Sequence, residues 1–417
     1  MCTTRGLPMR GLAVLLAGAV SGGAMAATPE GFDFHGYFRV GAGSNSAGGD
    51  QVCFKLPGAA SKYRLGNECE GFGSLTLSQT LPPTADGAQY KVAVQFAYNT
   101  PAEQDWEAYD TALREIYAEG KGVIGGALKD SRFWVGKRLR RTDVHMTDFF
   151  YWDNSGSGGG VEDVPAGPGK FSYAYMHWVD GRDEFGNPTT VKDHAITSHD
   201  LRWYDLPVNE NGKLALGFDL RRSDESRSGL DGRHGYMLHV VHRQNEVWGG
   251  SNTLALQYGA GAAATLSRDA DDSLDDAARS WRLVEQIHVE PHADWSGQAT
   301  LVYERKDYLK QTWWSFGVRP IYHFTDHFNV AVELGHDSVK PDAGAGRTLT
   351  KLTLAPQLAR GRGYYSRPVL RLFITYAAWN AAAMAADSSG VLGGGSSGPF
   401  ATDTSGLTYG VQAEAWW

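Results

Sequence analysis

Apolar and polar side chains alternate along many short segments of the chain. Residues 32–40 (FDFHGYFRV), 90–98 (YKVAVQFAY) and 213–221 (KLALGFDLR) each set apolar residues on one face against a mostly polar second face. A two-residue period predicts β-strands, because successive side chains of a strand point to opposite faces. Similar alternation appears at residues 253–258, 299–306, 328–336, 351–357 and 367–376. The strands are spread evenly with no helical block between them, so we predict a single all-β domain.

Alternation alone does not separate a β-sandwich from a membrane barrel, because both bury one face of each strand. Aromatic residues make up 12% of the chain, as the aromatic girdles of a barrel require. In the last segment, LTYGVQAEAWW, Trp417 falls on the apolar face and Trp416 on the polar one. We therefore predict a transmembrane antiparallel β-barrel, with Trp417 towards lipid and Trp416 inside. The rival from another class is a secreted β-sandwich that binds or hydrolyses glycans.

The first 26 residues are typical of a cleaved signal peptide, with Arg5 and Arg10 before an apolar core and a small-residue cleavage site. Residues 27–417 are then predicted to form the barrel domain. Removal of two arginines leaves 37 basic and 47 acidic residues, a net charge of −10. This balance argues against nucleic-acid binding, which needs a basic surface.

Two cysteines remain after removal of the signal segment, Cys53 and Cys69. In an exported chain we predict that they form a disulfide, which would restrain an otherwise flexible stretch, residues 54–68. His288, Glu290 and His292 imitate a metal site, but a two-residue spacing also places ordinary polar side chains together on one strand face. We predict no metal and no cofactor.

Several long strings resemble the maltoporin family, in the same order along the chain. They are DFHGYFR, SKYRLGNECE, QDWEAYDTALRE, VGKRLRRTDVHMTDFFYWD, YYSRP and EAWW. The resemblance implies an 18-stranded barrel with an inward-folded constriction loop, assembled as a homotrimer in the outer membrane of a Gram-negative bacterium. It implies a channel and no enzymatic activity, with maltose and maltodextrins as the solutes.

The resemblance also implies which residues contact the sugar. The aromatic slide, a path along which sugar rings move, falls on Trp106, Phe72, Tyr37, Trp416, Tyr365 and Leu238. The flanking polar track falls on Arg39, Arg64, Arg114, Arg141, Asp143, Asp148 and Asp153. The alternation of side chains along a strand supports part of this set independently. Tyr37 shares the polar face of its strand with Arg39, and Trp416 shares the polar face of its strand with Glu414. Aromatic rings suit the apolar face of a pyranose, and arginine and aspartate suit the hydroxyls at its edge.

Three positions depart from the family pattern. Phe150 stands where a constriction tyrosine is common, Leu238 where the last slide aromatic is usual, and Ser74 where an acid is usual. Tyr236 shares a face with Leu238 and could replace it. These departures leave the preferred solute open, and the alternatives are a channel for another oligosaccharide, such as sucrose, or a general diffusion porin.

Overall fold

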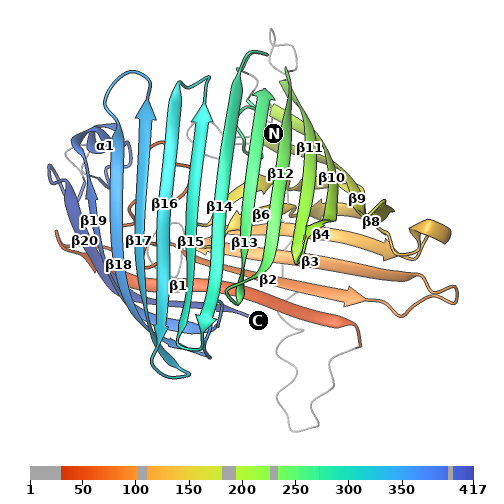
Figure 1. The fold of residues 1–417 in the computed structure, drawn as a ribbon, viewed down its shortest axis with the longest axis horizontal. Coiled ribbons are helices and arrows are strands. Elements are labelled where there is room, and N and C mark those ends of the chain that lie inside the picture. The colour runs from red at the N-terminus through yellow and green to blue at the C-terminus, as the bar shows by residue number, and fades with distance from the viewer. Residues whose placement is uncertain (1–29, 101–109, 181–193, 226–232, 272, 393–397) are drawn as a thin grey trace, which may run out of the picture.

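The computed structural model describes residues 30–100, 110–180, 194–225, 233–271, 273–392 and 398–417 (Figure 1). Within these residues, eighteen antiparallel strands form one sheet that closes on itself, because β20 pairs with β1. The wall strands are β1 (Phe32–Asn45), β2 (Gly71–Thr80), β3 (Gln89–Thr100), β4 (Asp110–Lys121), β5 (Arg132–Arg138), β8 (Gly156–Ala166), β9 (Gly169–Asp180), β10 (His194–Asn209), β11 (Gly212–Glu225), β12 (Arg233–Val247), β13 (Gly250–Gly261), β14 (Arg279–His292), β15 (Trp295–Lys306), β16 (Gln311–His323), β17 (Phe328–Pro341), β18 (Arg347–Ala359), β19 (Val369–Trp379) and β20 (Ser405–Trp416). The predicted barrel and its strand number are confirmed.

Little of the described chain lies outside the wall. The short strands β6 (Arg141–Val144) and β7 (Phe149–Asp153) form a separate hairpin, and two short helical turns are η1 (Gly126–Leu128) and α1 (Ala381–Ala386). None of the helices in the described ranges is long and apolar enough to cross a membrane. The predicted signal peptide, residues 1–26, lies outside the described residues.

The polarity of the wall is inverted relative to a soluble protein. The outward face carries exposed apolar side chains, among them Leu75, Phe96, Ile116, Val240, Leu256, Leu352, Leu370 and Leu372. The inward face carries buried charged side chains, among them Asp200, Asp219, Arg221, Arg282, Glu304, Arg319, Glu333 and Lys351. A β-sandwich would place its apolar residues between two sheets, so the structure decides for the barrel.

Aromatic rings gather on the outward face near both ends of the strands. Trp281 and Trp314 flank Tyr303, with ring centroids 4.5 and 4.4 Å from it. Near the opposite end, Trp295 lies 5.0 Å from Tyr322. Such girdles mark the two membrane interfaces of a barrel. Trp417 belongs to the outward face as predicted, since it packs against Phe34 at 5.5 Å.

Two segments fold into the barrel and form its apolar core. The β6–β7 hairpin contributes Val144, Met146 and Phe149, and these side chains cluster with Phe54 and Leu56 of the connection between β1 and β2. Cys53 and Cys69 form the predicted disulfide at the ends of that connection. Residues 54–68, which the disulfide was expected to restrain, are also held by packing. They pack inside the barrel, because their apolar residues find partners on the hairpin and their polar residues find partners on the wall.

Candidate functional site

Three aromatic side chains form a continuous stripe on the inward face of three adjacent strands. Tyr37 of β1 and Trp416 of β20 are register partners, and their rings lie 6.4 Å apart at an interplanar angle of 17°. Phe72 of β2 lies 5.9 Å from Tyr37 on the other side. The strand period explains the stripe, since each residue occupies an inward position of its own strand. Phe72, Tyr37 and Trp416 are all partly accessible, so they present ring surface to the lumen.

The fourth predicted aromatic, Tyr365, lies on the connection between β18 and β19 and reaches the stripe through His145. The ring of His145 lies 5.5 Å from Tyr365 and 5.8 Å from Trp416, edge-on to both. Sequence reasoning missed His145, although it stands in the VHMTD string of the hairpin. Burial, followed by the nearby Arg64 guanidinium, holds the pKa of His145 well below its ordinary value. The imidazole is therefore neutral at physiological pH.

Charged side chains hold Tyr37 and Trp416 of the stripe in position. Arg64 donates to the Tyr37 hydroxyl at 2.7 Å, and that hydroxyl donates to Glu414 at 3.2 Å. Glu414 also pairs with Arg64 at 3.1 Å and with Arg367 at 2.8 Å. The Arg367 guanidinium covers the Trp416 ring at 4.2 Å. Glu414 and Arg367 were not predicted as site residues, although Glu414 shares the inward parity of Trp416.

The predicted polar track divides into two groups. In the first group, Arg39 lies within ion-pair distance of Glu68, Glu70 and Asp148, and its guanidinium lies 5.1 Å from the Phe72 ring centroid. Arg64 also pairs with Glu68, at 2.8 Å. This group therefore borders the aromatic stripe.

The second group of the track lies on the hairpin. Arg141 of β6 is the register partner of Asp153 of β7, and Asp143 is the partner of Phe150. The Arg141 guanidinium lies 3.9 Å from the centroid of the predicted constriction residue, Phe150. Burial and the neighbouring Asp148 raise the pKa of Asp143. Arg114 stands on β4, where the charges of Arg141 and Asp153 act on it.

One predicted slide residue, Leu238, does not join the stripe, and another, Trp106, cannot be compared with it. The prediction for Leu238 is wrong, because this side chain lies on the outward face with Tyr236 and Val240 and is 44% exposed. Its neighbour His239 points inward and stacks on Trp152. Tyr236 lies on the same outward face as Leu238, so it does not replace Leu238 in the stripe either. Trp106 lies outside the described residues.

A polar cavity of about 380 Å³ adjoins the end of the stripe. Tyr365 and His145 form part of its lining, and strand side chains such as Asn245, Thr253 and Gln286 supply amide and hydroxyl groups. These groups can both donate and accept hydrogen bonds, as a hydroxyl-rich solute requires.

His288, Glu290 and His292 of β14 do not come together as a set of metal ligands. The His288 imidazole lies 3.2 Å from Glu290, whereas His292 pairs with Asp294 at the end of the strand. Across the part of the chain that the structure describes, no group of three His, Cys, Asp or Glu side chains is placed to hold a metal ion.

Comparison with known proteins gives both a family and a fold. A family model described as LamB porin matches residues 32–417. Among solved structures, Pseudomonas aeruginosa OpdK with vanillate has a TM-score of 0.50 at 11% identity, covering 93% of this chain and 99% of that one. Pseudomonas aeruginosa OccD3 (OpdP) also has a TM-score of 0.50, at 10% identity, with coverage of 93% and 91%. Acinetobacter baumannii OccAB1 has the same TM-score and identity, with coverage of 93% and 97%.

The narrower expectation, that this chain is a maltoporin, is wrong. The family match supports the LamB porin family as a whole, and the structural neighbours named above are porins of the Occ type and not maltoporins. Neither comparison supports maltodextrins as the solutes of this chain.

Proposed function

Because the chain belongs to the LamB porin family, we propose that it is a substrate-specific channel for a short oligosaccharide other than a maltodextrin, such as sucrose. Porins of this fold lie in the outer membrane of Gram-negative bacteria and are channels, so no reaction is assigned to the chain. The observation that carries the proposal is the aromatic stripe Phe72–Tyr37–Trp416 on a wet, charged inward face.

The chemistry of the stripe fits a sugar better than it fits an ion. A pyranose ring has an apolar face of C–H groups and an edge of hydroxyls, so it stacks on an aromatic ring and hydrogen-bonds at its rim. Arg39 borders the stripe as a rim donor and Glu70 borders it as an acceptor, while the buried pair Arg64 and Glu68 supports them. Tyr365 continues the aromatic surface beyond Trp416, next to the polar cavity.

Transport requires that each contact be modest. A millimolar site corresponds to roughly 4 kcal/mol of binding free energy, and a channel that holds its solute much more tightly conducts it slowly. Several stacking surfaces in series meet this condition, because a ring can leave one surface as it reaches the next. We assign Phe72, Tyr37, Trp416 and Tyr365 to stacking and Phe150 to the constriction.

We also propose a polar track, a cleaved signal peptide and a trimeric assembly. The polar track consists of Arg39, Arg64, Arg114, Arg141, Asp143, Asp148 and Asp153. Residues 1–26 are a cleaved signal peptide and residues 27–417 the barrel domain. A homotrimer is proposed as the working assembly, and an apolar outward groove over β1 to β5 supports it, lined by Phe32, Leu77, Val92, Ile116 and Val135.

The test is ion current through the purified protein in a planar bilayer, titrated with sucrose, raffinose and maltohexaose. We expect saturable block by sucrose or raffinose at millimolar concentration and weaker block by maltohexaose. Block that is tightest with maltohexaose would overturn the proposed solute. Conductance with no block by any sugar would instead identify a general diffusion porin.

A further inference from the structure

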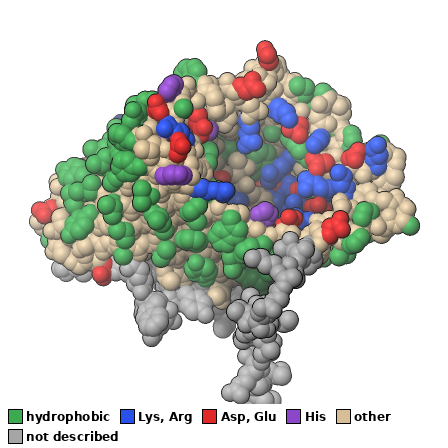
Figure 2. Space-filling model, turned by 90° about the horizontal axis from the view of Figure 1, so that it is seen from below, with side chains coloured by type: hydrophobic (Ala, Val, Ile, Leu, Met, Phe, Trp, Pro, Cys, Tyr) green, Lys and Arg blue, Asp and Glu red, His purple; other side chains and the backbone are tan. Residues whose placement is uncertain are grey.

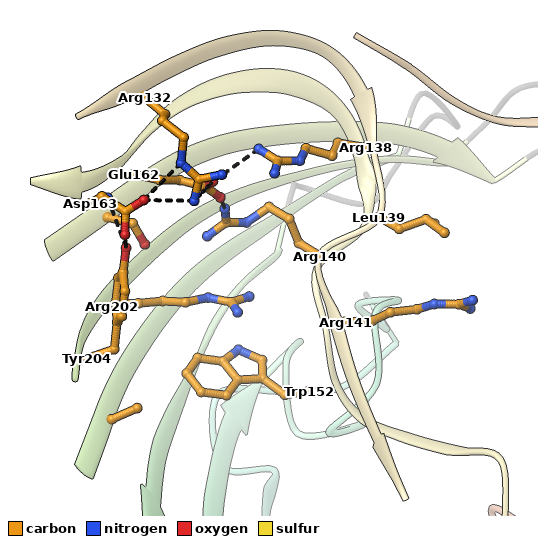
Figure 3. Close-up of a pocket in the computed structure, with 12 residues that line it drawn as sticks. Arg132, Arg138, Leu139, Arg140, Arg141, Trp152, Glu162, Asp163, Arg202 and Tyr204 are labelled. Carbon is orange, nitrogen blue, oxygen red and sulfur yellow. Dashed lines mark hydrogen bonds and ion pairs between the residues drawn. The ribbon is translucent and has the colours of Figure 1, made fainter. Parts of the chain in front are cut away.

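A second cavity, of about 360 Å³, opens among arginine side chains on another part of the inward wall (Figure 3). Arg132, Arg138, Arg140, Arg141 and Arg202 all line it. The stripe and its track use only Arg141 of these. Seen from the end with the short turns, the barrel is hollow, and Lys and Arg side chains gather around the hollow (Figure 2).

Carboxylates are present at this cavity but are shared among the arginines. Glu162 lies within ion-pair distance of Arg132, Arg138 and Arg140. Asp200 lies within the same distance of Arg140 and Arg202. Asp163 and Glu119 add two further carboxylates, both paired with Arg132. Each of the four acids therefore already has at least one arginine partner.

The guanidinium N–H donors at the cavity outnumber the carboxylate oxygens. Arg132, Arg138, Arg140 and Arg202 share the four carboxylates, whereas Arg141 extends away from this cluster (Figure 3). Each guanidinium carries five N–H donors and no acceptor, so the cavity has more donors than its carboxylates can accept from. A cation is excluded from such a site by repulsion.

A buried donor without an acceptor provides an independent observation. Trp152 lines the cavity and is 4% exposed, and its indole N–H has no hydrogen-bond partner among the described atoms. The ring is fixed between Arg202 at 4.2 Å and His239 at 4.3 Å, so the N–H has a fixed direction. Buried donors are normally satisfied, so this N–H is available to an acceptor that enters the cavity, whether water or a solute.

We propose that this cavity is an oxyanion site on the permeation path, which receives the carboxylate or phosphate of an acidic solute. An oxyanion offers several acceptor lone pairs and no donor, which matches guanidinium and indole N–H groups. The inference deepens the proposed function and rests on it for the existence of a pore: it adds that an acidic group on a sugar strengthens binding in this pore relative to the same sugar without that group.

Arg138→Gln tests the site with the least disturbance of the fold. Arg138 pairs with Glu162 and Glu119, and Arg132 lies within ion-pair distance of both acids, so neither carboxylate loses its last partner. Arg362→Gln is the matched control, because Arg362 pairs with Asp294 and Asp326 at the same end of the barrel but does not line the cavity. Trp152→Phe is a second variant, which keeps an aromatic ring and removes the N–H.

The measurement is the block of bilayer current by glucose, glucuronate and glucose 6-phosphate. We expect one of the two acids to block more tightly than glucose. We expect Arg138→Gln to weaken that block roughly tenfold, the effect of losing one charge-assisted hydrogen bond. Trp152→Phe should weaken it less, and Arg362→Gln should leave it unchanged. The acid that blocks more tightly identifies the group as a carboxylate or a phosphate.

The outcomes separate this inference from the proposed function. Equal block by glucose and both acids, or equal losses in Arg138→Gln and Arg362→Gln, would overturn the oxyanion site and leave the sugar channel standing. Block by the acids without any block by sucrose or raffinose would overturn the proposed solute and support the oxyanion site. If Arg138→Gln does not insert into bilayers, unchanged acid block in Trp152→Phe counts against the site.

Discussion

Trp416 has two different faces in the structure. One side stacks with Tyr37, and the Arg367 guanidinium lies over the ring at 4.2 Å. The neighbouring Trp417 points the opposite way and packs against Phe34. The two adjacent tryptophans therefore lie in different surroundings, one in the lumen and one towards lipid, because successive side chains of a strand point to opposite faces.

Replacement of Trp416 should weaken solute binding without harm to the wall. We expect Trp416→Ala to raise the half-blocking concentration of the preferred sugar roughly five- to tenfold, since about 1 kcal/mol or more of stacking is lost. The measurement is the same bilayer titration. Leu238→Ala is the control, because Leu238 is outward-facing, and an equal loss in both variants would contradict the assignment of the stripe.

His145 should make the folded state sensitive to mild acid. The pKa of His145 is lowered in the folded state by burial and by Arg64. Below the ordinary His pKa of about 6.5, the imidazole is therefore protonated in the unfolded chain but remains neutral in the folded chain. Stability is therefore full above pH 6.5 and falls as the pH drops from there towards the lowered pKa. We expect His145→Phe to reduce the difference between the urea midpoints at pH 7.5 and pH 5. An unchanged difference would show that other groups cause the pH dependence.

Alternation within a strand placed Tyr37 and Trp416 on the inward face, as the structure has them, but it was not used to correct Leu238. Tyr37 and Trp416 stand among charged neighbours, so their inward direction could be inferred from the sequence alone. Leu238 was placed by the order of a motif, although Tyr236 and Val240 beside it form an apolar outward row. Glu414 and His145 were missed because their importance depends on contacts between distant segments.

The β6–β7 hairpin lies inside the barrel, and Trp152 packs it against the wall. The Trp152 ring occupies the space above Gly217 of β11, where an added Cβ would lie 2.4 Å from it. Gly217 therefore leaves room for the tryptophan between β10 and β12.

Substitution of this glycine should displace the hairpin. We expect Gly217→Ala to destabilise the protein by about 1–3 kcal/mol and to change single-channel conductance, because the tryptophan must shift. Conductance steps and urea midpoints are the measurements. Gly346→Ala is the control, since its added Cβ would meet nothing closer than 3.9 Å. A conductance equal to that of the wild type would mean that Trp152 does not position the hairpin.

The connection between β1 and β2 is the second element inside the barrel. Tyr63 hydrogen-bonds with Ser315 at 2.9 Å, and Lys351 donates to the Tyr63 carbonyl at 2.7 Å. The same connection carries Arg64 to the stripe. Its position was not predictable, because its sequence has no strand or helix period and its partners lie more than 250 residues away.

Loss of the disulfide should loosen this connection more than it loosens the wall. For Cys53→Ser with Cys69→Ser, the chain-entropy model gives a loss of about 3 kcal/mol. We expect faster proteolysis within residues 54–68 and weaker sugar block, since Arg64 would no longer be held against Tyr37. Limited proteolysis of both proteins, folded and inserted, is the measurement. Equal cleavage rates would indicate that packing alone holds the segment.

At the scale of the whole molecule, charges lie inside and apolar residues lie outside. Glu333 is buried with Arg319 and Lys351 as partners, and Glu304 is buried with Arg282. Overall alternation and aromatic content predicted this inversion from the sequence. The strand number came from the resemblance, because strand boundaries do not follow from alternation alone.

The outward face should also hold the assembly together. The apolar groove over β1 to β5 has a volume of about 560 Å³, and we expect a second copy of the chain to cover it. Ile116→Ala with Val135→Ala should lower the temperature at which the trimer dissociates in detergent. Leu370→Ala with Leu372→Ala, which alters another outward groove, should not. Equal effects in the two double variants, or a monomer throughout, would contradict the proposed trimer interface.

The pairing of β1 with β20 has a kinetic consequence. Gly36 and Trp417 exchange backbone hydrogen bonds of 3.2 Å across this seam, which joins the two ends of the sheet. Closing the loop that runs from Gly36 to Trp417 costs about 5 kcal/mol of chain entropy. We therefore expect the seam to form late in folding. The stripe crosses the same seam, with Tyr37 on one side and Trp416 on the other. Sugar block in a refolding experiment should therefore appear only with complete closure, after most strands have paired.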